Sequence, residues 1–232
     1  MNNSKVIVAL DFASDKAAMQ LVEKLNPELC RLKVGKELFT RCGPTLVKDM
    51  VSSGFDVFLD LKFHDIPNTV AKACESAAEL GVWMINVHSM GGVAMMEAAR
   101  SVLSHEDAPI LIAVTLLTSS GENELNALGI DQTPADFVKR LAAMTQSAGL
   151  NGVVCSAQEA SMLKQQCGSD FLLITPGIRP ENAKADDQNR IMTPKQAVDN
   201  GSDYLVIGRP VTQSDDPVQV LKEINAQIGF AS

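Results

Sequence analysis

Residues 56–69 read DVFLDLKFHDIPNT, and this stretch decides the fold. Its first seven residues, 56–62, form a short run dominated by Val, Phe and Leu, which predicts a buried strand. Polar residues and Pro67 follow, and they favour a turn that leads into an amphipathic helix over 69–80. A strand and a helix in this order make one unit of a parallel sheet covered by helices.

The same unit recurs along the rest of the chain. Amphipathic helices, several of them opened by Asp, Ser, Asn or Pro, are predicted at 17–25, 69–80, 93–103, 135–148 and 217–228. Strands are predicted at 6–11, 31–36, 56–62, 83–89, 110–115, 152–156, 171–176 and 204–208. Eight strands that alternate with helices predict an α/β protein of the (β/α)8 TIM-barrel class, with a parallel eight-stranded barrel.

A doubly wound open sheet gives a similar alternation and is the alternative to a barrel. Its dinucleotide-binding form carries Gly-x-Gly-x-x-Gly after the first strand, where this chain has Asp11-Phe-Ala-Ser-Asp15. That difference favours the barrel. The length of 232 residues suits one barrel, and no linker rich in Pro, Gly or Ser divides the sequence, so we expect a single domain over residues 1–232.

Composition and charge disfavour several classes of function. The formal net charge of −8 comes without a block of basic residues, so we expect no binding to nucleic acid or to an anionic membrane surface. No apolar run approaches the ~18 residues of a membrane span, and the start of the sequence lacks the pattern of a signal peptide. The five cysteines include no Cys-x-x-Cys pair, which favours reduced thiols in a cytoplasmic protein.

Polar residues gather at the predicted strand ends. In (β/α)8 barrels the chemistry lies at the C-terminal ends of the strands and in the loops that follow them. In this chain those places hold Asp11, Lys33, Asp60, Lys62, His88, Thr118, Ser156, Arg179 and Arg209. We therefore expect these side chains to converge on one rim of the barrel.

The densest group of charges consists of Asp60, Lys62 and Asp65, with Lys33 on the neighbouring strand. Asp60 and Lys62 are two residues apart on a strand, so we expect their side chains on one face. Alternating lysines and carboxylates keep one another charged in a partly dry pocket. Such an array can place a carboxylate against an anionic leaving group and an ammonium beside a developing carbanion. The alternative is a set of structural salt bridges on the rim.

Five blocks of the sequence resemble the orotidine 5′-phosphate decarboxylase family, in its bacterial type, and together they span nearly the whole chain. They are VALD at 8–11, LKVG at 32–35, FLDLKFHDIPNT at 58–69, TPGIRP at 175–180 and VIGRPVT at 206–212. The pattern Asp-x-Lys-x-x-Asp alone is shared with other barrel enzymes, including sugar-phosphate decarboxylases and hexulose-phosphate synthases. The continuation to Thr69 and the block at 175–180 select the decarboxylase family.

The resemblance implies a carboxy-lyase that converts orotidine 5′-phosphate to uridine 5′-phosphate and carbon dioxide, the last step of de novo UMP synthesis. It implies that Lys62 donates the proton to pyrimidine C6, within a catalytic network of Lys33, Asp60, Lys62 and Asp65. It also implies a homodimer in which Asp65 and Thr69 reach the active site of the partner subunit. No metal, pyridoxal or thiamine cofactor is expected.

The resemblance also implies which residues bind the rest of the substrate. Asp11 and Lys33, beside Asp60, match contacts to the ribose hydroxyls. Ser156 matches a contact to the pyrimidine, and Thr118 matches a residue that enters the site after the fifth strand.

Phosphate binding is expected after the last two strands, where barrels often hold this group with backbone N–H groups and a helix N-terminus. Gly208 permits close approach of the backbone, and Arg209 offers a planar fork of donors to phosphate oxygens. Arg179 and Gln188 belong to a long polar loop at 178–193, whose length suggests a lid that closes over the ligand.

Three alternative functions remain. A Schiff-base aldolase would need a neutral, desolvated Lys33 or Lys62, which the flanking carboxylates disfavour. A metal-dependent sugar-phosphate enzyme would hold its cation beside Asp60, where the lysines already supply positive charge. The third alternative is a non-catalytic nucleotide-binding module. No catalytic role is expected for the histidines, which form no metal motif: His64, His88 and His105.

Overall fold

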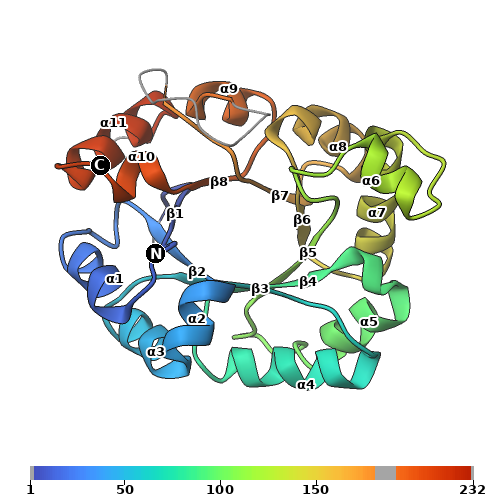
Figure 1. The fold of residues 1–232 in the computed structure, drawn as a ribbon, viewed down its shortest axis with the longest axis horizontal. Helices are drawn as coiled ribbons and strands as arrows, with labels where there is room; N and C mark the ends of the chain where they lie inside the picture. The colour runs from blue at the N-terminus through green and yellow to red at the C-terminus, as the bar shows by residue number, and fades with distance from the viewer. Residues whose placement is uncertain (1–2, 181–191, 231–232) are drawn as a thin grey trace.

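Eight parallel strands pair in chain order, and the last strand returns to pair with the first, so the sheet closes into a barrel (Figure 1). The computed structural model describes residues 3–180 and 192–230. The strands are β1 (Val6–Ala9), β2 (Arg31–Gly35), β3 (Val57–Phe63), β4 (Met84–His88), β5 (Ile110–Val114), β6 (Gly152–Val154), β7 (Leu172–Thr175) and β8 (Tyr204–Ile207). The predicted (β/α)8 barrel is confirmed. The assignment of all 232 residues to one domain stays a prediction.

Helices form a ring around the barrel, with α1, α4 and α7 in different sectors of Figure 1. The α-helices are α1 (Asp15–Val22), α2 (Lys36–Cys42), α3 (Pro44–Ser52), α4 (Pro67–Ala78), α5 (Val93–Ser101), α6 (Glu122–Ala127), α7 (Pro134–Ser147), α8 (Ala160–Cys167), α9 (Pro194–Asp199), α10 (Arg209–Thr212) and α11 (Pro217–Gln227). Two 3₁₀ turns are η1 (Ser89–Gly91) and η2 (Ala157–Glu159). Among the described helices, none is both long and apolar enough to cross a membrane.

Side chains that accept hydrogen bonds from the first turn fix where several helices begin. The hydroxyls of Ser14 and Thr133 accept from backbone N–H groups of α1 and α7, and the carboxylate of Asp216 does so for α11. Proline occupies the first turn of α4, α7 and α11, where its missing N–H leaves no bond unmade. The predicted helix starts lie within two residues of these observed starts.

Most predicted strands end earlier than the sequence pattern suggests. The strand predicted at 6–11 ends at Ala9, although the Leu10 N–H still donates to the Lys33 carbonyl oxygen. The strand predicted at 31–36 ends at Gly35, because Lys36 begins α2. The residues beyond these strand ends leave the sheet and form the rim. Their sequence still follows the pattern of a strand, so the pattern alone predicts strands that are too long.

Two apolar layers hold the barrel together. On β1, Val6 and Val8 face the helices, whereas Ile7 and Ala9 point into the barrel, as strand alternation requires. The interior layer consists of Ile7, Ala9, Phe58, Met84, Ile112, Ile174 and Val206. The barrel centre is therefore a packed core, as is usual for this fold.

A cluster of Arg31, Trp83 and Tyr204 lies at the N-terminal end of the barrel. The Arg31 guanidinium carbon is 4.5 Å from the centre of the Trp83 ring and 5.2 Å from that of Tyr204. The same guanidinium group pairs with Asp56 at 3.2 Å and donates to the Ser4 carbonyl oxygen. This cluster packs beneath the interior layer.

Candidate active site

A cavity of about 680 Å³ opens at the C-terminal ends of the strands. Small-molecule sites commonly measure roughly 300–1,000 Å³. Its apolar floor belongs to the barrel strands and includes Ala9, Phe58, Val154 and Val206. The predicted site residues that line it are Asp11, Lys33, Asp60, Lys62, Thr118, Arg179, Gly208 and Arg209. Lining residues that sequence reasoning missed include Phe12, Leu116, Pro176, Gly177, Thr212 and Gln213.

Four alternating charges run across the wall of this cavity. Lys33 Nζ lies 3.5 Å from Asp11 Oδ1 and 3.2 Å from Asp60 Oδ2. Lys62 Nζ lies 2.6 Å from Asp60 Oδ1. The side chains of Lys33 and Asp60 are 12% and 11% exposed, against 70% for Asp11, so the array leads from solvent into a poorly hydrated wall. In such surroundings charges interact more strongly than they do in water.

The array determines the charge of its central carboxylate. Burial alone would raise the pKa of Asp60, because desolvation disfavours an anion. The charges of Lys33 and Lys62 outweigh burial, helped by hydrogen bonds from Lys62 and Asn86, and the pKa of Asp60 falls below its ordinary value. Asp60 is therefore an anion at neutral pH, with a lysine on either side.

Lys62 reaches Asp60 by a route that strand alternation does not describe. Lys62 has a φ of 53°, in the left-handed region, and the register of β3 against β4 shifts between Leu59 and Phe63. The expectation that the two side chains share a face agrees with their contact and with their place in one cavity, although the backbone between them is irregular. The irregular backbone at Lys62 resembles a β-bulge, a feature common beside active sites.

Asn86, in the interior of β4, contacts both ends of this irregular segment. Its side-chain Oδ1 accepts the backbone N–H of Lys62 at 2.8 Å, and its Nδ2 donates to Asp60 Oδ1 at 2.7 Å. Sequence reasoning missed this residue. The available signal was a lone amide inside the apolar run Met84-Ile-Asn-Val-His88, which implies a buried polar group that needs partners.

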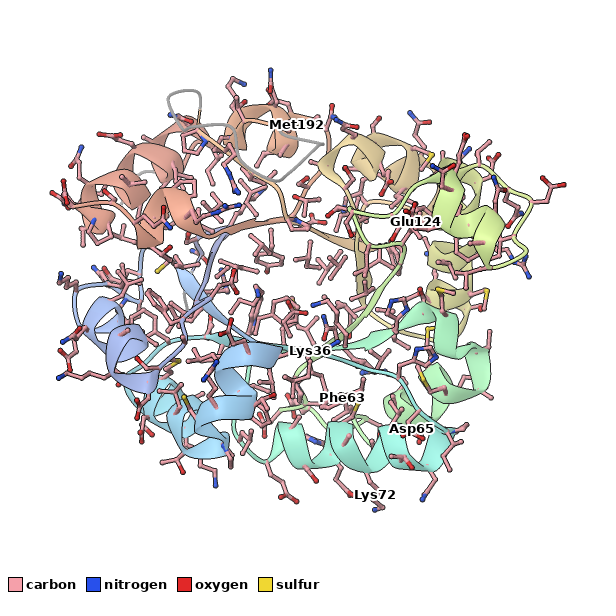
Figure 2. The ribbon with its side chains drawn as sticks, in the orientation of Figure 1. Lys36, Phe63, Asp65, Lys72, Glu124 and Met192 are labelled. Carbon is pink, nitrogen blue, oxygen red and sulfur yellow. The ribbon has the colours of Figure 1, made fainter. Side chains whose placement is uncertain are left out.

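Asp65 and Thr69 do not join the array within this chain. They belong to the exposed segment 64–69, in which the side chain of Ile66 is 66% exposed. The Asp65 carboxylate accepts the N–H of Ile66 at 2.6 Å. Figure 2 shows Asp65 near the start of α4, away from the centre of the barrel. A role for either residue at the cavity of its own subunit is not visible in this geometry.

Ser156 lies next to the cavity lining but is turned into the protein. It is 2% exposed, and its hydroxyl accepts the N–H of Gln158 at 3.3 Å. Its own N–H donates to the Glu159 carboxylate at 2.9 Å, so Ser156 begins η2. Cys155 and Val154, and not Ser156, line the cavity. The predicted pyrimidine contact stays a prediction.

The predicted phosphate region lies on one side of the cavity. Gly208 and Arg209 follow β8, and Arg179 follows β7. The N–H of Arg179 donates to the Met192 carbonyl oxygen at 3.0 Å, and Ile178 pairs with Met192. The ends of the predicted lid at 178–193 therefore lie side by side. Gln188 and the rest of that loop fall outside the described residues.

Two histidines stack near the rim without lining the cavity. The ring centres of His64 and His88 are 5.5 Å apart. Burial lowers the pKa of His88 to about 4, with further contributions from His64, Lys36 and Lys62. Its Nδ1 accepts the N–H of Met90 at 3.4 Å, which requires an unprotonated nitrogen. Throughout residues 3–180 and 192–230, no three His, Cys, Asp or Glu side chains are grouped to hold a metal ion.

A closed (β/α)8 barrel with a charged, ligand-sized cavity at the C-terminal ends of its strands defines a barrel enzyme that acts on a small molecule. Residues 4–224 match the family described as Orotidine 5′-phosphate decarboxylase / HUMPS family. The chain belongs to this family.

Individual relatives resemble the chain over nearly its full length. A protein of Shewanella sediminis named orotidine 5′-phosphate decarboxylase is 59% identical over 232 residues, which cover 99% of each chain. One with the same name from Pseudoalteromonas translucida is 58% identical and covers 97% of each. The crystal structure of orotidine 5′-phosphate decarboxylase from Lactobacillus acidophilus superposes with a TM-score of 0.87 at 37% identity, covering 97% of this chain and 99% of that one.

Proposed function

We propose that the chain is a carboxy-lyase that converts orotidine 5′-phosphate to uridine 5′-phosphate and carbon dioxide. The observation that carries the proposal is the buried contact of Asp60 with Lys33 and Lys62 at the cavity wall. The names of the relatives, at up to 59% identity, support the choice of substrate. This activity would supply the last step of UMP synthesis in the cytoplasm, and the free thiols of all five cysteines suit that location.

In the proposed reaction, the bond between C6 and the carboxylate carbon breaks and its electron pair stays on C6. Carbon dioxide leaves, and C6 takes a proton from the Lys62 ammonium group. Lys62 then regains a proton from water. The step is redox-neutral and needs no external electron acceptor, so no cofactor enters the proposal.

Catalysis in this proposal is electrostatic. A carbanion in the plane of the pyrimidine ring is poorly delocalised, so the enzyme must supply stabilisation of about 20 kcal/mol, near the upper end of the enzymatic range. The Lys62 ammonium stabilises the charge that develops at C6. The two lysines keep the Asp60 carboxylate ionised, so it repels the carboxylate of the substrate. This repulsion ends when carbon dioxide departs, which favours the reaction.

The rest of the substrate would bind through groups distant from C6. Gly208, Arg209, Arg179 and Gln188 would hold the phosphate. The ribose would contact Asp11 and Lys33, and the pyrimidine would contact Ser156 and Thr118. Binding energy from these remote groups can stabilise the transition state at C6.

The active enzyme in this proposal is a homodimer. Asp65 and Thr69 are exposed and lie apart from the cavity of their own chain, which suits a role at the cavity of a partner. The exposed apolar side chains of Ile66 and Met90 in the same region also suit burial against a second subunit.

The first test measures the loss of orotidine 5′-phosphate absorbance in buffer containing a chelator. Lys62→Ala should lower kcat by on the order of 10³-fold, because a proton donor in contact with the reacting atom is lost. Lys139→Ala removes a lysine that pairs with Asp136 on the outer helix α7, and should leave kcat unchanged.

Three outcomes would contradict the proposal. Equal rates for Lys62→Ala and the intact protein would remove the assigned proton donor. Borohydride trapping of substrate on Lys62 would indicate a Schiff-base enzyme. Activity that disappears with chelator and returns with magnesium would indicate a metal-dependent enzyme.

A further inference from the structure

Asn86 is a fully buried amide that the proposed mechanism does not use. Its side chain is 0% exposed, in the middle of a strand whose other buried residues are apolar. It does not line the cavity. An amide in such a place is stabilised only if its donors and acceptor find partners, and both of its partners belong to the catalytic segment of β3.

The two hydrogen bonds fix the orientation of the amide. The backbone N–H of Lys62 must meet an acceptor, which is Oδ1 of Asn86, and the Asp60 carboxylate must meet a donor, which is Nδ2. A rotation of the amide by 180° would bring two donors together at Lys62 and two acceptors together at Asp60. Asn86 is therefore complementary to the backbone of one charged residue and to the side chain of the other.

The bond to Lys62 matters because of the backbone at that residue. A lysine rarely adopts a φ of 53°, which the surrounding structure must hold in place. The register shift between β3 and β4 also removes Lys62 from the regular ladder, and the Asn86 side chain takes the place of the missing backbone acceptor. Through this bond, Asn86 determines where the lysine side chain begins.

We propose that Asn86 is a positioning residue that holds Lys62 in its left-handed conformation and Asp60 in its orientation, and so aims the Lys62 ammonium at the reacting carbon. This inference rests on the proposed function. In this inference, the Asn86 side chain holds the Lys62 ammonium and the Asp60 carboxylate in their mutual contact, in which Lys62 Nζ lies 2.6 Å from Asp60 Oδ1.

The test compares Asn86→Ala with Asn225→Ala as a matched control. Asn225 is also a buried amide, 1% exposed, with one bond donated to the Leu29 carbonyl oxygen and one accepted from the Ser4 hydroxyl. Asn86→Ala should lower kcat per folded molecule by about 10²-fold, because a small misplacement of a reacting group has that effect, while KM changes little. Asn225→Ala should lower stability and leave kcat unchanged.

Asn86→Asp provides a second readout that folding alone would not move. The new carboxylate can still accept the Lys62 N–H, but it places a second negative charge beside Asp60. Because the two carboxylates repel each other, the pair keeps one proton up to a higher pH than Asp60 does alone. The acidic limb of the kcat profile should therefore shift to higher pH, with activity recovering as pH rises. Because this variant has nearly the same shape as the original, it carries the test even if Asn86→Ala does not fold.

Lys62→Ala, measured in parallel, separates this inference from the proposed function. If Lys62→Ala is inactive while both Asn86 variants keep the kcat and pH profile of the intact protein, the positioning role is overturned and the proposed function stands. If Lys62→Ala is as active as the intact protein, both are overturned.

Discussion

His88 shows how one residue can link stability to pH. Its pKa is lowered to about 4, first by burial and then by His64 and two lysines, and its Nδ1 is occupied by the N–H of Met90. The folded protein therefore takes up the His88 proton only near pH 4, whereas an unfolded chain takes it up near the ordinary value of 6.5. Between these two values the unfolded state binds more protons.

The free energy of unfolding should consequently fall as pH is lowered from 6.5 to about 4. We expect the contribution of His88 to be about 1–2 kcal/mol, less than the full pKa shift implies, because the side chain is partly exposed to solvent. His88→Asn keeps an oxygen that can accept the Met90 N–H and removes the titrating ring. Urea unfolding at several pH values and a fixed protein concentration should show a shallower decline in this variant.

The control for this measurement is His105→Asn, which removes an exposed histidine from the loop between α5 and β5. This variant should retain the pH dependence of the intact protein. A decline between pH 6.5 and 4 that is identical in His88→Asn would show that other groups cause it.

At the scale of elements, Gly152 limits how closely β6 and β7 approach. A Cβ atom at this position would lie 2.1 Å from the carbonyl oxygen of Leu172, its register partner on β7. Gly152→Ala should therefore destabilise the protein by about 1–3 kcal/mol, because the strands must separate. Gly121→Ala is the control, since its Cβ would meet nothing closer than Glu124 Oε2 at 3.7 Å.

Both variants can be compared by thermal unfolding followed by circular dichroism. We expect Gly121→Ala to change stability by less than about 1 kcal/mol. If the two variants unfold at the same temperature, the close approach of β6 and β7 does not prevent a side chain at residue 152, and the prediction is wrong.

The existence of the strands could be predicted from the sequence, but not their ends. Strands buried on both faces read as continuous apolar runs, and such runs identified all eight. Their ends depend on where the sheet stops and the rim begins. Leu10 and Lys36 continue the local pattern, yet one leaves the strand and the other begins a helix.

The charged residues of the site were also predictable, whereas their support was not. Lys33, Asp60 and Lys62 lie from the middle to the C-terminal part of β2 and β3 and line the cavity, on the side of the barrel where the fold itself points to chemistry. Asn86 supports the site only because the register of β3 against β4 shifts beside Lys62. Asn86 is 26 residues from Asp60 in the sequence, so its hydrogen bond to Asp60 could not be predicted locally. No local propensity predicts a lysine with a positive φ, so the conformation of Lys62 became visible only in the folded chain.

At the scale of the whole molecule, the proposed sharing of sites between subunits can be tested by mixing two inactive variants. If Asp65 serves the partner, a dimer of one Lys62→Ala subunit and one Asp65→Ala subunit has one site with both changes and one site with neither. Random mixing should then restore about a quarter of the sites, because half of the dimers are mixed and each holds one intact site.

Co-expressing the two variants with different tags and measuring kcat would check this expectation, and the purified mixed dimers should have half of their sites active. Should Asp65 serve its own subunit instead, every site in a mixed dimer would carry one change and no activity would return. Lys62→Ala expressed with both tags, so that every subunit carries the same change, provides the background rate.

The cluster of Arg31, Trp83 and Tyr204 beneath the barrel has a practical consequence for protein engineering. It packs at the N-terminal end, while the cavity lies at the opposite end, with the interior layer between them. Libraries that vary the cluster can be selected for heat tolerance, and libraries that vary the cavity lining can be selected for new substrates. Trp83 and Tyr204 pack against the same interior layer that supplies the cavity floor, so improvements should combine additively only where the varied cavity residues lie away from that layer.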